Sequence, residues 1–185
     1  MQKRSHKLLA SSLLRSHCGF AARRYEWAFL FGSFQPDCNP FTFLRGSFRS
    51  RTLCGHSFSN SQHYINTRIR KLQRCPVWRT WHYYTLGKLT HYLADAFTYP
   101  HNETFPDTLM DHHRYETALR RALAEHLSSH LPSPQPRCHD LPAVIARLYR
   151  RYIQTESDAL NDIRYILEAT ALLMAGCAPS HCASR

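Results

Sequence analysis

Apolar residues recur at helical spacing along most of the chain. The clearest case lies between residues 111 and 129, where Leu119, Leu123 and Leu127 follow one another every four residues. Side chains three or four residues apart share one face of an α-helix, so this segment has an apolar stripe. The same argument predicts helices from the cap Ser5 through Leu14, at 20–31, from about 65 to just before Pro76, and at 78–97, 140–154 and 157–175. No segment alternates persuasively as a strand does, and the chain is predicted to be all-α.

Polar and proline-rich stretches predict where these helices begin and how they are connected. Ser5, Asp140 and Ser157 each precede a periodic segment, and a side-chain oxygen in this position accepts a hydrogen bond from the first helical turn. Residues 41–59 are rich in Phe, Arg and Ser without helical spacing and are expected to form an extended loop. A proline-rich connector lies at about 131–140.

Length and composition predict one domain. The chain has 185 residues, 43% of them hydrophobic and only 6 of them glycine. This is enough to bury a core, and the piece after the connector is too small to fold alone. We therefore expect a single helical bundle over residues 1–177, with a flexible tail at 178–185.

Net charge, cysteines and the N-terminal sequence bear on the partners of the protein and on its location in the cell. The formal net charge of +11 predicts either an anionic partner or a solvated basic surface. The seven cysteines form no CxxC pair and are expected to be reduced thiols. The start MQKRSHK precedes only a short apolar run without a clear cleavage site, so we expect no signal peptide and a cytoplasmic protein. No stretch is long enough to predict a membrane-spanning helix.

Residues that can bind metal are concentrated in the segment HYLADAFTYPH. His91 and Asp95 lie one helical turn apart, and His101 follows a proline. The pair lies opposite the apolar face, but Lys88 is the only other charge from Trp81 to Phe97, so the helix is expected to be buried nearly all round. Gly87, one turn before, would let another backbone or a substrate approach closely. Taken alone, the pair is only weak evidence for a metal site and fits a structural role.

A second pair opens the next helix, where His112 and Glu116 extend its apolar stripe. A buried carboxylate must be paired, hydrogen-bonded or metal-bound, because leaving it bare is costly. A buried His–Glu hydrogen bond and a shared cation both satisfy this requirement. With His91, Asp95 and His101, the pair makes three histidines and two carboxylates on one helix–loop–helix. Nitrogen and carboxylate ligands without thiolate suit Zn²⁺ in a catalytic role.

These residues resemble the zinc-dependent phospholipases C of bacteria, which share an all-α fold with the single-strand-specific zinc nucleases of fungi and plants. That family carries HxxxD, a histidine six residues beyond the aspartate, and then HxxxE. The matching residues here are His91 and Asp95, His101, and His112 and Glu116. The gap between His101 and His112 is a few residues shorter than in the secreted members.

Weaker matches lie upstream, and the resemblance spans about residues 5–125. GSFQPDC resembles a loop whose aspartate is a ligand, here Asp37, and LCGHSF offers His56. The SH at the start of the first helix resembles an N-terminal ligand motif, here His6. In the secreted members, cleavage frees the α-amino group of the first mature residue, and this group is also a ligand. Here His6 lies only five residues after Met1 and no cleavage site is evident, so this part of the third ligand set has no clear match.

The resemblance implies two or three zinc ions. Its ligand sets would be Asp37, His56, His91 and Asp95 for one ion, His101, His112 and Glu116 for a second, and His6 with a bridging Asp95 for a third. It implies hydrolysis of a phosphodiester, with a phospholipid headgroup or a nucleotide as the phosphoester substrate and Asp37 orienting or deprotonating the attacking water.

Three other functions remain open at this point. One is a nuclease or nucleotidase of the same fold, which the net charge favours; the others are a non-catalytic zinc-binding helical module and a helical adaptor without metal. LRGSFRSR, residues 44–51, predicts peripheral contact with an anionic membrane or nucleic acid, or else a solvated basic loop. The remaining histidines are expected to be structural or exposed, with His82 and His113 as candidates for supporting the metal ligands.

Overall fold

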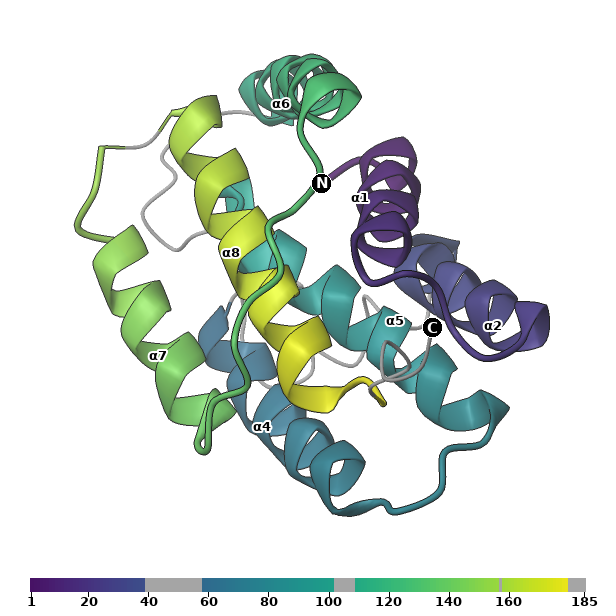
Figure 1. Ribbon diagram of the computed structural model, residues 1–185. Helices are drawn as coiled ribbons and strands as arrows, with labels where there is room; N and C mark the ends of the chain where they lie inside the picture. The colour runs from purple at the N-terminus through teal and green to yellow at the C-terminus, as the bar shows by residue number, and fades with distance from the viewer. Residues whose placement is uncertain (39–57, 102–108, 157, 180–185) are drawn as a thin grey trace.

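The computed structural model describes residues 1–38, 58–101, 109–156 and 158–179. Within these ranges the chain is helical and contains no strand, which confirms the predicted all-α class (Figure 1). The α-helices are α1 (Lys3–Ser16), α2 (Arg23–Phe34), α4 (Phe58–Arg74), α5 (Thr80–Ala96), α6 (Leu109–Ser129), α7 (Leu141–Tyr152) and α8 (Ala159–Cys177), and two 3₁₀ turns are η1 (Gln35–Cys38) and η2 (Tyr99–His101). Among the described residues, no helix is both long and apolar enough to cross a membrane.

Helix α5 lies at the centre of the bundle, with α2, α4 and α8 packed around it (Figure 1). Leu86, Leu89 and Leu93 form its apolar face and are completely buried. His91 and Asp95, on the opposite face, are buried as well. The prediction that this helix is buried nearly all round is therefore confirmed, except in its first turn, where Trp81 is exposed.

The closest helix crossing joins α2 to α5 through two glycines. A Cβ atom added at Gly87 would overlap the carbonyl oxygen of Phe29, and one added at Gly32 would overlap the carbonyl oxygen of Tyr84. The two backbones are therefore in direct contact, which only residues without a side chain allow. The sequence allowed either another backbone or a substrate beside Gly87, and the structure places the backbone of α2 there.

The connector between α6 and α7 crosses the molecule and is hydrogen-bonded at both of its ends (Figure 1). The Ser16 hydroxyl, at the end of α1, donates to the carbonyl of Pro132 at 2.6 Å. The Arg137 guanidinium donates to the carbonyls of Ala175 and Ala178, at the end of α8, at 3.0 and 2.8 Å. The connector thus joins elements that are far apart in the sequence.

Helix starts agree only in part with the predicted caps. Asp140 precedes α7 and accepts a hydrogen bond from its first turn at 3.2 Å, as predicted. Ser5 is not a cap: α1 begins earlier because Gln2 is the last extended residue and its carbonyl already accepts the Ser5 amide at 2.8 Å. Ser157 lies outside the described residues, and Asp158 is the residue that caps α8.

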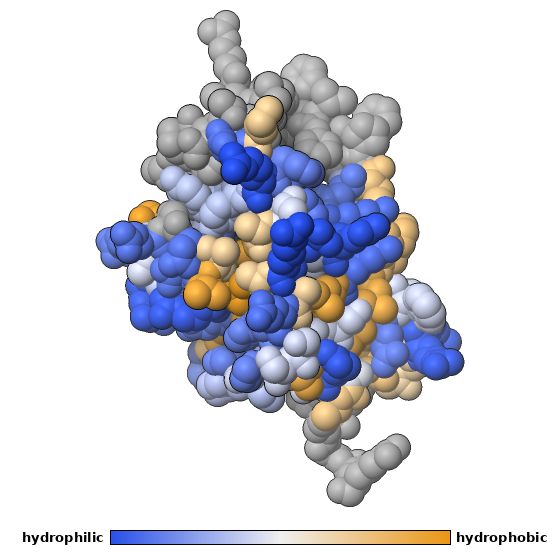
Figure 2. All heavy atoms as spheres, turned by 90° about the horizontal axis from the view of Figure 1, so that it is seen from above, coloured by the Kyte–Doolittle hydropathy of each residue, from blue (hydrophilic) through white to orange (hydrophobic). Residues whose placement is uncertain are grey.

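Two further predictions concern the loop at 41–59 and the cysteines. Most of the predicted loop at 41–59 lies outside the described residues, and its last two positions already belong to α4. The cysteines in the described part of the chain form no disulfide. Seen from above, charged and polar side chains dominate the surface, and apolar side chains show between them (Figure 2).

Candidate metal centre

Seven of the eight residues predicted as metal ligands meet in one place. They come from five elements: His6 from α1, Asp37 from η1, His91 and Asp95 from α5, His101 from η2, and His112 and Glu116 from α6. His56 lies outside the described residues. We call His6, Asp37, His91 and Asp95 the inner group and His101, His112 and Glu116 the outer group; within each group, one ligand atom per residue lies within 4.8 Å of the others.

The inner group is organised around the Asp95 carboxylate. One of its oxygens, Oδ1, lies 3.1 Å from His6 Nε2, and the other, Oδ2, lies 3.2 Å from His91 Nε2. The two imidazole rings stack with their centroids 3.9 Å apart. Asp37 lies on the other side, with Oδ1 3.6 Å from His91 Nε2 and Oδ2 3.9 Å from His6 Nε2. Asp95 can therefore serve two neighbouring cations with one oxygen each.

Tight packing explains why His91 is held in this orientation. Because α2 and α5 touch at Gly32 and Gly87, the carbonyl of Ser33 reaches to within 3.0 Å of His91 Nδ1. A hydrogen bond there makes Nδ1 the protonated nitrogen and leaves the Nε2 lone pair directed at the two carboxylates. The crossing of two helices thus decides which ring nitrogen can bind a metal.

The outer group is more open. His101 Nε2 and His112 Nε2 each lie 3.4 Å from Glu116 Oε1, and their side chains and that of Glu116 are between 13% and 32% exposed. His101 also connects the two groups, because its Nε2 lies 4.0 Å from Asp95 Oδ1. The outer group is therefore the part of the centre that is most open to solvent.

The α-amino group of Met1 lies between the two groups. Its nitrogen is 2.7 Å from Asp95 Oδ1, 3.0 Å from Glu116 Oε1 and 2.9 Å from His101 Nε2. Burial lowers the pKa of this amino group, but the Asp95 and Glu116 carboxylates outweigh burial and raise it. In its charged form the Met1 ammonium pairs with Asp95 of the inner group and with Glu116 of the outer group.

The donor atoms fit a zinc site better than a hydrogen-bonded cluster. Among the described residues, neither ring nitrogen of His6 has a hydrogen-bond partner, although Asp95 lies only 3.1 Å away, and Asp37 Oδ2 has none either. Zn–N and Zn–O bonds of about 2.0–2.2 Å place two ligands of one tetrahedral ion roughly 3.4 Å apart. The ring nitrogens of His6 and the Asp37 and Asp95 carboxylates of the inner group lie at such separations without hydrogen bonds to one another, as ligands of a common ion do.

The protonation states also suit cation binding, which requires neutral imidazole and ionised carboxylate. Burial, together with the nearby His91, lowers the pKa of His6 to about 3. Burial alone would raise the pKa of Asp95, but the Met1 ammonium and the neighbouring histidines hold it well below its usual value. Burial likewise opposes the ionisation of Glu116, yet the hydrogen bond from His101 and the Met1 ammonium lower its pKa to about 2.

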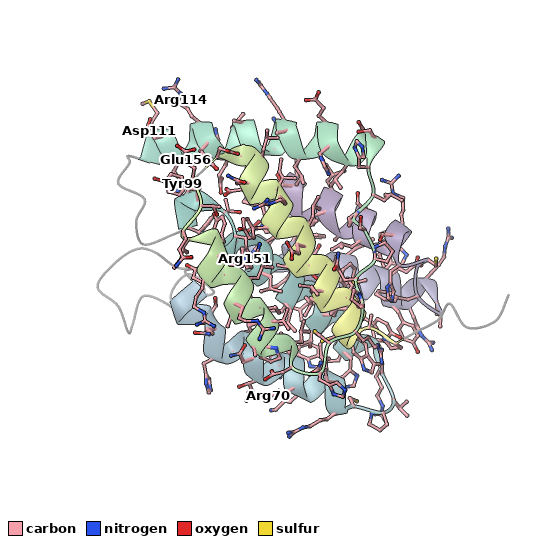
Figure 3. The ribbon with its side chains drawn as sticks, turned by 60° about the vertical axis from the view of Figure 1, so that its left-hand side comes forward. Arg70, Tyr99, Asp111, Arg114, Arg151 and Glu156 are labelled. Carbon is pink, nitrogen blue, oxygen red and sulfur yellow. The ribbon has the colours of Figure 1, made fainter. Side chains whose placement is uncertain are left out.

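A buried aspartate that the sequence analysis did not single out supports the outer group from α8. The Asp162 carboxylate accepts the backbone N–H of Tyr99 and the hydroxyl of Tyr115, both at 2.9 Å, and the hydroxyl of Tyr152 at 2.8 Å. Tyr99 begins the turn that carries His101, and Tyr115 precedes Glu116. Figure 3 shows Tyr99 near the first turns of α6 and α8. An aspartate in a first helical turn is usually part of a cap, so no local signal distinguished it.

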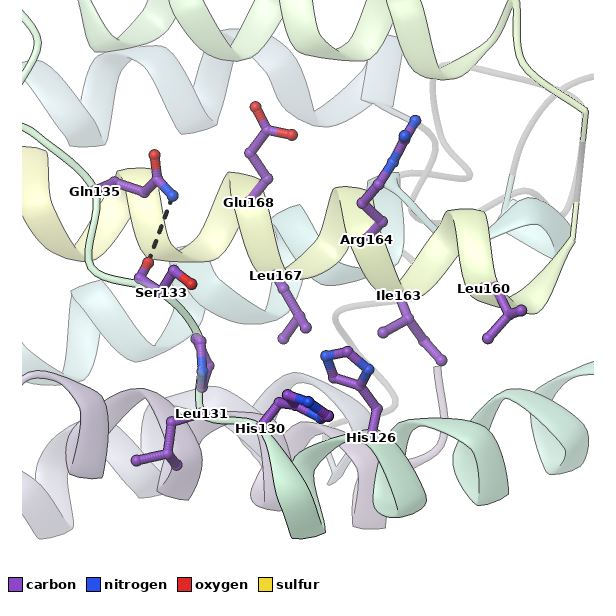
Figure 4. A pocket seen from close by; sticks show the side chains of 11 residues that line it. His126, His130, Leu131, Ser133, Gln135, Leu160, Ile163, Arg164, Leu167 and Glu168 are labelled. Atoms are coloured by element: carbon purple, nitrogen blue, oxygen red, sulfur yellow. Dashed lines mark hydrogen bonds between the residues drawn. The ribbon is translucent and has the colours of Figure 1, made fainter.

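Other candidates lie apart from this centre. His82 Nδ1 accepts the Arg79 backbone N–H at 2.8 Å and so completes the start of α5, while His113 is exposed on α6. A cavity of about 610 Å³ lies between the end of α6, the connector and α8, and none of the predicted ligands lines it (Figure 4).

Comparison with known families agrees with the geometry. The chain matches the family described as zinc dependent phospholipase C over residues 5–171. This chain belongs to the zinc-dependent phospholipase C family. The match includes all seven clustered side chains and Asp162. Nothing among the curated proteins or the solved structures matches the chain significantly.

Proposed function

We propose that this member of the zinc-dependent phospholipase C family hydrolyses a phosphodiester bond in a phospholipid or a related phosphoester. The observation that carries the proposal is the convergence of four histidines and three carboxylates from five elements on one partly open centre. When bound, zinc neutralises charge on the phosphoryl oxygens and lowers the pKa of water.

The two groups would hold separate ions. The inner group, with His56 as a further ligand, would bind one ion, and the outer group a second. Asp95 faces His6 and His91 of the inner group, and its Oδ1 also lies 4.0 Å from His101 Nε2 of the outer group, so it would contribute to both of these ions or to a third. We therefore propose two or three zinc ions in each chain.

Asp37 is the residue we assign to the proton of the attacking water. Its side chain is 21% exposed, whereas His6, His91 and Asp95 beside it are at most 2% exposed. Its Oδ2 accepts no hydrogen bond from the described residues. It is therefore the carboxylate of the inner group that a water or a substrate can approach, and it would orient the water and accept its proton.

Zinc content and turnover together test the proposal. Mass spectrometry of the purified protein should find two or three zinc ions per chain. His91→Ala should lose inner-group zinc and His112→Ala outer-group zinc, while His113→Ala, an exposed neighbour, should keep the full content. Fewer than one tightly bound zinc per chain, with no further loss in His91→Ala, would contradict the proposal.

The net charge of +11 keeps a nuclease or nucleotidase of the same fold as the second candidate. A panel of phosphatidylcholine, single-stranded DNA and RNA, and nucleoside monophosphates separates the two activities. We expect phosphatidylcholine to be cleaved fastest. Full zinc content without turnover of any of these substrates would instead indicate a non-catalytic zinc-binding module.

A further inference from the structure

Two neighbouring helices expose large aromatic side chains. Trp27 and Phe31 on α2 are 70% and 52% exposed, and Trp81 on α5 is 63% exposed. Single exposed apolar residues are common on protein surfaces, but a contiguous set marks an interaction site.

Ring contacts connect them across the two helices. Trp81 lies 4.9 Å from Tyr84, Tyr84 lies 6.0 Å from Phe31, and Phe31 lies 5.6 Å from Phe34, measured between ring centroids. Trp27, Phe31 and Phe34 follow at helical spacing and share one face of α2. We call the five residues Trp27, Phe31, Phe34, Trp81 and Tyr84 the aromatic patch. The glycine contact between α2 and α5 brings its two halves together.

Lysines lie beside two rings of the aromatic patch, Phe34 and Tyr84. Lys7 Nζ lies 4.4 Å and Lys3 Nζ 5.1 Å from the centre of the Phe34 ring, and Lys88 Nζ lies 5.9 Å from that of Tyr84. The acidic residues of α1, α2 and α5 are Glu26 and Asp95. Glu26 accepts the Phe20 amide at 3.3 Å, and Asp95 is buried in the metal centre. The patch therefore carries net positive charge.

The patch borders the candidate metal centre. Phe34 is the last residue of α2, and Asp37 follows in the adjoining turn η1. Tyr84 reaches the same turn, because its hydroxyl donates to Gln35 Oε1 at 2.9 Å. A surface held against the patch would thus lie beside the centre.

We propose that the aromatic patch, with Lys3, Lys7 and Lys88, binds the interface of a bilayer that contains anionic phospholipid. Tryptophan and tyrosine rings favour the headgroup level of a membrane, and lysines beside them attract anionic headgroups. This inference rests on the proposed function in one respect: a phospholipid substrate would be present in a bilayer.

Single-stranded nucleic acid also binds basic aromatic surfaces, but it stacks its bases on open ring faces. Here the Phe34 ring lies under Lys3 and Lys7, and the Tyr84 ring contacts Phe31 and Trp81. The Phe34 and Tyr84 rings are therefore covered in part, and Trp27, Phe31 and Trp81 are the rings that stay exposed. Exposed rings with lysine ammonium groups around them suit insertion among headgroups instead.

Co-sedimentation with vesicles tests the aromatic part of the proposal. The probe is a vesicle of equimolar phosphatidylcholine and phosphatidylglycerol. Trp27→Ala/Trp81→Ala should lower the partition coefficient by about tenfold or more, because each variant removes a large side chain from the interface. The matched control, Ile153→Ala/Leu160→Ala, removes exposed apolar side chains from the residue that follows α7 and from α8, and should stay within roughly twofold of the parent protein.

The charged part has its own test. Lys3→Gln/Lys7→Gln/Lys88→Gln should weaken binding to these vesicles by roughly fivefold per lysine and change binding to pure phosphatidylcholine little. Arg70→Gln/Arg150→Gln/Arg151→Gln removes equal charge from α4 and α7, where Figure 3 shows Arg70 and Arg151. This control should bind vesicles more tightly than the lysine variant does.

Equal losses in patch and control variants, or no loss in the patch variants, would overturn the proposal. So would patch variants that bind vesicles normally but lose a labelled single-stranded oligonucleotide, since the partner would then be nucleic acid. Zinc content and hydrolysis of monomeric short-chain phosphatidylcholine, measured on the same samples, should be unchanged in the tryptophan variant. Missing zinc or turnover in the parent protein would count against the proposed function alone.

Discussion

The inner and outer groups of the candidate metal centre contain the same kinds of ligand, but the fold supports them differently. Three inner ligands come from the buried faces of α1 and α5 and are almost inaccessible to solvent. The outer ligands come from a short turn and the beginning of α6, and are between 13% and 32% exposed. Packing at a helix crossing holds the inner group, whereas hydrogen bonds to Asp162 hold the elements of the outer group. The inner group is thus the buried part of the centre, and the outer group is the part that solvent can reach.

The largest effect should follow from breaking the support of the inner group. Gly87→Ala places a methyl group against the Phe29 carbonyl and pushes α2 from α5, so we expect a loss of about 3 kcal/mol in the free energy of unfolding. Inner-group zinc should decrease as well, because the Ser33 contact to His91 depends on this crossing. Urea unfolding and zinc analysis measure the two effects.

The matched control is Gly176→Ala in α8. There the added methyl group meets only the side chain of Leu141, which can rotate away, and alanine favours the helix by about 1 kcal/mol. Its unfolding free energy should therefore change little. Equal destabilisation by the two substitutions would show that the crossing has no special role.

An intermediate effect should follow from weakening the support of the outer group. Asp162→Asn replaces one accepting oxygen with a donor that faces the Tyr99 amide or a tyrosine hydroxyl. We expect the affinity for outer-group zinc to fall by about 10- to 100-fold, the range for residues that orient metal ligands. Inner-group zinc should stay bound, which competition with a calibrated chelator can resolve.

Two tyrosines separate positioning from general stability. Tyr115→Phe removes the hydrogen bond next to Glu116, whereas Tyr152→Phe removes a similar bond from α7, which carries no ligand. Both should destabilise the protein by about 1 kcal/mol, but only Tyr115→Phe should weaken zinc binding. If both weakened zinc binding equally, Asp162 would act through stability alone.

The smallest effect concerns Ser5, next to His6. Its hydroxyl is buried and makes no hydrogen bond with the described residues. Ser5→Ala should therefore leave stability unchanged or raise it by up to about 1 kcal/mol, and zinc content should not change. In contrast, Asp158→Ala removes a true cap and should cost about 1 kcal/mol. A clear loss of stability in Ser5→Ala would mean that the hydroxyl supports the inner group.

Local pattern was sufficient to predict which segments are helical, though not where each helix begins, and to identify the two His–carboxylate pairs. An apolar stripe on α6 and the nearly uncharged α5 indicated which faces are buried, because helical periodicity depends only on near neighbours in the chain. His91 with Asp95, and His112 with Glu116, could be recognised for the same reason, since each pair spans a single turn.

Long-range contacts decided the rest. No local pattern could show that His6 and Asp37 join the buried pair on α5, or that Asp162 reaches both elements of the outer group. Such contacts depend on how closely two helices approach each other. For α2 and α5 this distance is set by glycine, which has no side chain, as at Gly87. The sequence by itself therefore determined an all-α chain with pairs of candidate metal ligands on two helices. Only the tertiary structure decided that these pairs form one centre, because bringing them together requires packing between segments far apart in the chain.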